Sequence, residues 1–196
     1  MEKNNYKNKS GAGFTLIEIM VAITVFSIII SSIAGIFVTS IKEQRKTLTS
    51  QVLLDQTSYI LEYMSRSLRM ARKQISGETV CLPQRGLNYE IIGGGTGIRF
   101  INQLKTNDCE EFYLEDGKLK YKQDADTADP KKLDLTSDDI NITSLKFILW
   151  GNDQDDDFQP SVTLFLEAEG KGGISGTQPK IQIQTTISQR MLDVIY

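Results

Sequence analysis

The pattern of hydrophobic and polar positions changes abruptly at Gly13. The residues before it are polar and include three lysines and one glutamate. After it, Glu18 is the only charged residue before the 20 uncharged residues 19–38. A helix of that length can cross about 30 Å of hydrocarbon. The pattern therefore predicts one membrane-spanning helix, and the basic leader favours a cytoplasmic N-terminus.

A helical pattern continues beyond the apolar run. One set of positions, mostly apolar, recurs at steps of three and four, which is the spacing of one helix face: Leu53, Thr57, Ile60, Met64, Leu68, Ala71 and Ile75. The first proline is Pro83, so nothing breaks the pattern earlier. We therefore expect one helix from about Phe14 to about Gln74, closed near Gly77 and about 90 Å long at about 1.5 Å per residue.

From about residue 79 the pattern becomes that of strands. Residues 111–121 predict a hairpin that turns at Asp116-Gly117, and residues 140–150, 161–167 and 180–188 are rich in strand formers. The glycines of residues 93–97 predict a turn, because they lack the lysine of a phosphate-binding loop. The strand aromatics are expected in the core: Tyr113, Tyr121, Phe147 and Trp150.

These patterns predict an α+β chain, in which a long N-terminal helix packs on a C-terminal antiparallel sheet. The same patterns predict four segments: a leader over residues 1–13, a membrane or filament-core helix over 14–39, its amphipathic continuation over 40–76, and a β-rich head over 77–196.

Composition narrows the possible functions. The chain has no histidine, so Ser-His or Cys-His catalysis and a His-ligated zinc are excluded. A net charge of −3, with 19 basic and 24 acidic residues after Gly13, gives no basic footprint for nucleic acid. Scattered carboxylates form no catalytic constellation. We expect a protein that is not an enzyme and binds no nucleic acid.

Two further features suggest local chemistry. Cys81 and Cys109 are compatible with one disulfide if the head leaves the cytoplasm, with free thiols as the alternative. Asp153, Asp155 and Asp157 could offer oxygen ligands to calcium, although the glycine and distant glutamate of an EF-hand are missing. A solvated acidic turn between two strands is the favoured interpretation of that stretch.

The residues Gly13-Phe14-Thr15-Leu16-Ile17-Glu18 carry the most specific signal. GFTLIE at the start of an apolar helix, behind a short basic leader, resembles the class III signal of type IV pilins and type II secretion pseudopilins. In that family a prepilin peptidase cuts after the glycine, and the new N-terminal residue is N-methylated. The resemblance implies a cut between Gly13 and Phe14, methylation of Phe14, and a role for Glu18 in neutralising the amine of an adjacent subunit.

The resemblance also implies partners and a location. The partners are the prepilin peptidase, sibling subunits, an inner-membrane assembly platform, and membrane lipid before extraction. The protein would be a single-pass protein of the cytoplasmic membrane first and part of an extracytoplasmic filament afterwards. The general plan is similar to minor subunits of the J or W type. Several pseudopilins hold calcium in their heads. Apart from calcium, we expect no cofactor for this chain.

Alternative interpretations remain at this point. The apolar run could be a simple membrane anchor, and Glu18 could merely lie at the level of the lipid headgroups. The chain could also be a binding module, such as a tip adhesin, whose head recognises a ligand. Gly35 lies where many major pilins carry a helix-loosening proline, and a glycine there weakens a helix by about 1 kcal/mol relative to alanine.

Overall fold

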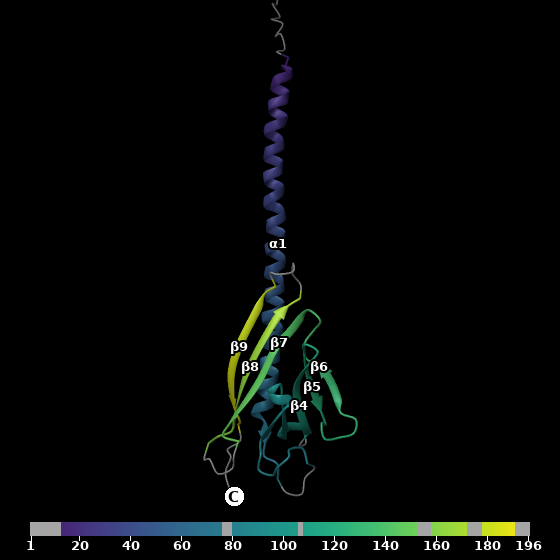
Figure 1. Cartoon of the computed structure of the whole chain (residues 1–196), viewed down its shortest axis with the longest axis vertical. Coiled ribbons are helices and arrows are strands. Elements are labelled where there is room, and N and C mark those ends of the chain that lie inside the picture. The colour runs from purple at the N-terminus through teal and green to yellow at the C-terminus, as the bar shows by residue number, and fades with distance from the viewer. Residues whose placement is uncertain (1–12, 76–79, 106–107, 153–157, 172–177, 191–196) are drawn as a thin grey trace, which may run out of the picture. The chain divides into compact units, whose positions relative to one another are not determined.

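The structure, a computed structural model, describes residues 13–75, 80–105, 108–152, 158–171 and 178–190 (Figure 1). The chain contains two compact units, Met1–Gln44 and Arg45–Tyr196. Helix α1 covers Leu16–Arg69 without interruption, including Gly35. All strand pairs that follow are antiparallel. The predicted α+β class, with one long N-terminal helix before the strands, is confirmed.

The strands form two antiparallel sheets, one of six strands and one of three. The first sheet contains β1 (Ala71–Arg72), β2 (Tyr89–Ile92), β3 (Gly97–Asn102), β4 (Asp108–Glu115), β5 (Lys118–Gln123) and β6 (Lys131–Asp134). The second contains β7 (Ile140–Trp150), β8 (Ser161–Gly170) and β9 (Lys180–Ser188), in that spatial order. Short 3-10 helices lie at Gly93–Gly95 and Gln103–Lys105, so the predicted glycine turn is confirmed.

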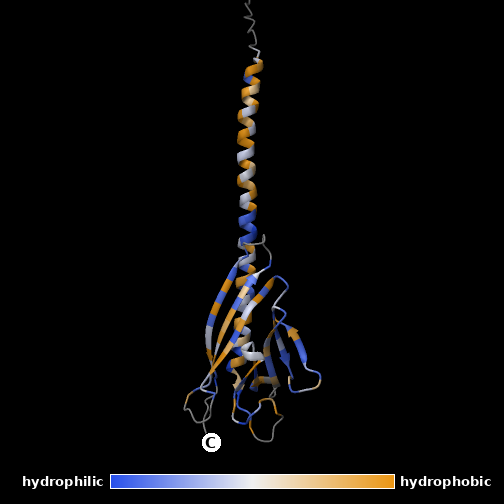
Figure 2. Cartoon of the chain, viewed as in Figure 1, coloured by the Kyte–Doolittle hydropathy of each residue, from blue (hydrophilic) through white to orange (hydrophobic). Residues whose placement is uncertain are grey.

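The first unit contains the apolar part of α1. Its large hydrophobic side chains are all exposed, and Figure 2 shows this part of the ribbon coloured mostly as hydrophobic. By length and composition this helix could cross a membrane, since its apolar window has a mean hydropathy of 2.5 and no buried side chain. An isolated helix with such a surface is unstable in water but suited to lipid.

The second unit is held by a core that the last turns of α1 share with both sheets. The buried face of the helix carries Leu53, Thr57, Ile60, Met64, Ser67 and Leu68. Against it lie Phe100, Phe112 and Tyr121 of the first sheet and Leu145, Leu164, Leu166 and Ile187 of the second. The ring of Phe112 stacks on that of Phe100 at 5.8 Å between centroids. Five of the predicted face positions are therefore confirmed in the helix.

The predicted hairpin at Asp116-Gly117 is confirmed. Both residues have positive φ, 53° and 72°, which is the conformation that a two-residue turn of type I′ requires. Glu115 and Lys118 pair across the turn. The carbonyl of Gly117 accepts a hydrogen bond from the amide of Ile142 at 2.8 Å, and an added Cβ would lie 2.1 Å from the Asn141 side chain. Glycine is needed here for both reasons.

The helix ends at Arg69, earlier than the expected end near Gln74. The reason is that its last carbonyl oxygens find partners elsewhere in the fold. The Tyr89 hydroxyl donates to the Leu68 carbonyl at 2.8 Å, and the Arg190 amide donates to the Arg69 carbonyl at 2.8 Å. Burial raises the pKa of Tyr89, so its hydroxyl stays a neutral donor.

The chain beyond the helix end then joins the first sheet. Ala71 pairs with Asn102 as part of β1, so this predicted face position is buried in a strand and not in a helix. Ile75, the last predicted face position, is 51% exposed. Gly77, where the helix was expected to close, lies outside the described residues.

Strand assignment from sequence was right for β7 and β9 and too short for β8, which continues to Gly170. The strands β1, β2, β3 and β6 were not predicted. Tyr121 and Phe147 are buried as expected, and Tyr113 is half-buried. Trp150 was wrongly placed in the core: it is 66% exposed at the end of β7, where its ring meets that of Phe158 at 5.9 Å between centroids.

Candidate processing and assembly site

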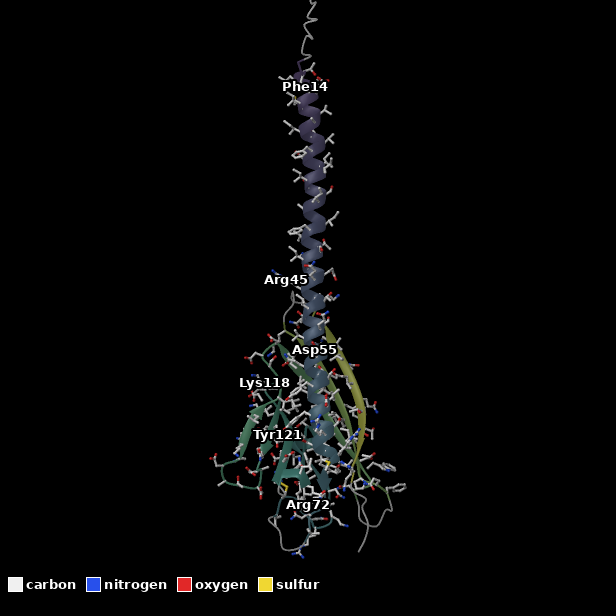
Figure 3. The ribbon with its side chains drawn as sticks, turned by 180° about the vertical axis from the view of Figure 1, so that it is seen from behind. Phe14, Arg45, Asp55, Arg72, Lys118 and Tyr121 are labelled. Atoms are coloured by element: carbon white, nitrogen blue, oxygen red, sulfur yellow. A yellow bond between two sulfur atoms is a disulfide. The ribbon has the colours of Figure 1, made fainter. Side chains whose placement is uncertain are left out.

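The motif lies where a non-helical segment of backbone leads into α1. Gly13, Phe14 and Thr15 are not helical, and the helix begins at Leu16. The Phe14 side chain is 84% exposed and lies at the start of the helix in Figure 3. A peptide bond in exposed, non-helical backbone can be bound by a peptidase without unwinding a helix first. The bond between Gly13 and Phe14 meets this requirement.

Thr15 and Glu18 form a reciprocal cap on the first turn of α1. The backbone amide and the hydroxyl of Thr15 both donate to Oε2 of Glu18, at 2.9 Å and 2.8 Å. In return, the amide of Glu18 donates to the Thr15 hydroxyl oxygen at 3.3 Å. This is a capping box, which satisfies backbone amides that have no partner within the helix. A negative charge in the first turn also interacts favourably with the helix dipole.

The cap leaves part of the Glu18 carboxylate available. Both hydrogen bonds to Glu18 end on Oε2, and Oε1 accepts none from the residues that the structure describes. A carboxylate has about four lone-pair positions, so Oε1 can accept from a further donor while the cap stays intact. The cap therefore orients the carboxylate at the start of the helix and leaves Oε1 able to accept a further hydrogen bond.

Neither the backbone conformation of Gly13 nor its described surroundings require a glycine at this position. Its φ is not in the left-handed region, and an added Cβ would meet nothing within 4 Å in the part of the chain that is described. Gly117, by contrast, is required by both φ and contact. A glycine that the fold does not need is consistent with recognition by another protein.

The hydroxyl side chains of the apolar helix are satisfied within the helix itself. Each donates to the carbonyl four residues earlier, at distances of 2.6–3.0 Å: Thr24, Ser27, Ser31, Ser32 and Thr39. Their presence is therefore compatible with a lipid environment.

Cys81 and Cys109 form a disulfide, with their Cα atoms 5.6 Å apart. They lie in a small buried cluster with Leu82 and Ile101. The aspartates considered for calcium, Asp153, Asp155 and Asp157, lie outside the described residues. Among the residues that are described, no group of three or more Cys, Asp or Glu side chains could hold a metal ion.

The disulfide gives a testable prediction for the head. Replacing both cysteines with alanine should lower the free energy of unfolding by about 2–4 kcal/mol, because the crosslink restricts the unfolded chain. Denaturant titration of the full chain in detergent measures this. A reducing agent should destabilise the native protein equally and leave the double variant unchanged, since the chain has no other cysteine. A native protein that is insensitive to reduction would contradict the prediction.

Residues 8–34 match the family model described as the prokaryotic N-terminal methylation motif. The chain therefore carries a class III prepilin signal, which is consistent with a type IV pilin-like protein. Neither the curated proteins nor the solved structures contain a match to the chain. Together with α1, the one helix among the described residues that is long and apolar enough to span a membrane, the signal fits a membrane-anchored precursor. The motif is characteristic of structural rather than catalytic proteins.

The capping box is the part of the site that sequence analysis missed. Its signal was present, because a threonine followed three residues later by a glutamate before an apolar run is the signature of this cap. The sequence placed Glu18 at the membrane edge as a charge in need of a partner. The structure shows that it has one local partner in Thr15 and one oxygen left over.

Proposed function

We propose that this chain is a minor pilin or pseudopilin: a precursor that a prepilin peptidase cuts after Gly13 and that is then built into an extracytoplasmic filament. The observation that carries the proposal is the match of residues 8–34 to the N-terminal methylation motif. The exposed, non-helical backbone at Gly13, directly before the capped start of α1, supports it.

The proposed cut is a hydrolysis. Water adds across the amide between Gly13 and Phe14, which leaves a carboxylate on the leader and a free amine on Phe14. This amine, next to be methylated, is positively charged at neutral pH. It lies one residue before the capping threonine, so the mature chain begins with a cation immediately ahead of an anchored carboxylate.

The proposed role of Glu18 follows from that pairing. A carboxylate within or beside hydrocarbon is costly without a partner. In a filament, the amine of an adjacent subunit can donate to Oε1 of Glu18, while Thr15 keeps Oε2. The charge-assisted bond neutralises both groups and fixes the axial position of one helix against the next. Sibling subunits, the assembly platform and the prepilin peptidase are the partners that this proposal requires.

The proposal is tested by the intact mass and the N-terminal peptide of the native protein from its own membranes. The expected result is a terminus at Phe14 that carries one extra methyl group. A terminus at Met1 in cells with an active prepilin peptidase would overturn the proposal, because the helix would then be a permanent anchor.

A further inference from the structure

A groove runs between the last turns of α1 and the end of β9, within the second unit. Its volume is about 860 Å³. Its walls are polar side chains and one methionine from the two elements and the residues just after them: Glu62, Ser65, Arg66, Arg69, Met70, Thr186, Ser188 and Arg190. A hydrogen bond from the Arg190 amide to the Arg69 carbonyl joins the two elements at one end. The groove is therefore part of the folded head.

The groove is basic on a protein that is acidic overall. It contains three arginines and one glutamate, whereas the whole chain has a net charge of −3. Glu62 is already bound by Arg66, with 2.7 Å between Oε1 and Nη2. The guanidinium groups of Arg69 and Arg190 are exposed and make no ion pair or hydrogen bond with any residue that the structure describes. Two charges are thus left for an anionic partner.

One wall of the groove is the free edge of a sheet. β9 pairs only with β8 among the described strands, and Figure 1 shows it as an outer strand of its sheet. The Gln189 amide donates to Pro160 on the β8 side. Because backbone groups alternate in direction along a strand, the amides and carbonyls of Thr186 and Ser188 face away from β8.

This edge lacks the usual protection against pairing. Natural edge strands commonly carry charged residues, proline or bulges that prevent another strand from pairing with them. β9 contains no proline and a single charge, Lys180, at the end away from the groove. Its solvent-facing side chains near the groove are uncharged: Gln184, Thr186 and Ser188. An open edge beside two arginines that have no ion pair among the described residues is suited to an extended chain that carries carboxylates.

We infer that this groove binds an extended acidic segment of a different protein, which adds as a strand to the edge of β9 and places its carboxylates on Arg69 and Arg190. Main-chain hydrogen bonds to the edge would supply affinity, and the arginines would select acidic side chains. A symmetric contact between two copies of this chain is disfavoured, because it would bring the same arginines face to face. The inference does not depend on the filament, since it concerns the head alone.

The test measures peptide binding to the full chain in detergent micelles by fluorescence anisotropy. The probe is a labelled peptide of four Glu-Thr repeats, and the same peptide with glutamine in place of glutamate is the control. The acidic peptide should bind saturably. The double substitution Arg69→Gln/Arg190→Gln should weaken binding roughly fivefold to tenfold, which is typical of two partly exposed ion pairs. The matched control Arg45→Gln/Arg85→Gln, at exposed arginines outside the groove, should leave binding unchanged.

A second pair of variants tests the strand edge. Thr186→Pro removes an edge-facing amide without removing a backbone bond to β8, and should weaken binding. Both it and the control Thr186→Val lose the hydroxyl contact with Thr163 of β8, so that loss is matched. Thr186→Val keeps the amide and should bind normally, and circular dichroism checks that both variants are folded. Equal loss of affinity in the two arginine double variants, or equal binding of the two peptides, would overturn the inference. Normal binding by a folded Thr186→Pro protein would overturn strand addition, and self-association that requires Arg69 and Arg190 would overturn the choice of a different protein.

Discussion

Replacing Gly13 with valine should slow the cutting of the precursor and leave most of it unprocessed. The surroundings of Gly13 within the chain have room for a side chain, so the substitution should not disturb α1. A peptidase site shaped for glycine must instead accommodate a branched side chain, and overpacking of this kind costs about 1–3 kcal/mol. Since about 1.4 kcal/mol is tenfold in rate, processing should slow by roughly tenfold to a hundredfold.

The measurement is the ratio of precursor to mature chain by mass spectrometry, in cells that contain the chain's own processing system. Gly11→Val is the matched control, because it changes the same residue type two positions earlier in the leader. It should be processed at the normal rate. If Gly13→Val is processed as fast as the native chain, the proposed cleavage site is wrong, whatever happens in later assembly.

Replacing Glu18 with glutamine should permit processing and prevent assembly. Glutamine can replace glutamate in a capping box, so the first turn of α1 and its bonds to Thr15 should survive. The negative charge is lost, however, and with it the charge-assisted bond from the amine of a neighbouring subunit. Such bonds contribute about 1.5–3 kcal/mol, which corresponds to a loss of filament incorporation of roughly tenfold to a hundredfold.

Thr15→Ala separates capping from charge. It removes the hydroxyl of the cap, at a typical cost of about 1 kcal/mol to the helix start, but retains the Glu18 carboxylate. Immunoblots of sheared filament fractions and membrane fractions measure incorporation for each variant. We expect Thr15→Ala to assemble better than Glu18→Gln. The reverse order would mean that Glu18 acts through the cap and that no intersubunit charge pair is required.

The extent of sequence-based prediction depended on how local each signal was. The apolar run, the buried face from Leu53 to Leu68 and the hairpin at Asp116-Gly117 were predictable, because periodicity and turn chemistry act over a few residues. The end of α1 was not predictable, because its carbonyl partners are the Tyr89 hydroxyl and the Arg190 amide. Strands β2 and β3 were missed because their glycine-rich connection concealed two short runs.

The candidate site shows the same division. Gly13, Phe14 and Glu18 could be singled out by the motif alone, and the cap between Thr15 and Glu18 was in principle visible in the same residues. The groove could not be predicted. Arg69 carried only the signal of a charge in the last turn of a helix, and Arg190 belongs to a segment with no periodic pattern. Only the folded second unit brings them to one surface.

The internally bonded hydroxyls of α1 affect how precisely two such helices can be aligned along their axes. A serine or threonine that bonds across helices would mark a preferred axial alignment, but all five between residues 16 and 39 bond to their own backbone. The remaining surface is aliphatic or aromatic, and one turn resembles the next. Two such helices could slip past each other by a turn with little penalty, apart from the displacement of one carboxylate. In the proposed filament, the information that distinguishes a correct alignment from a slipped one is therefore concentrated in Glu18.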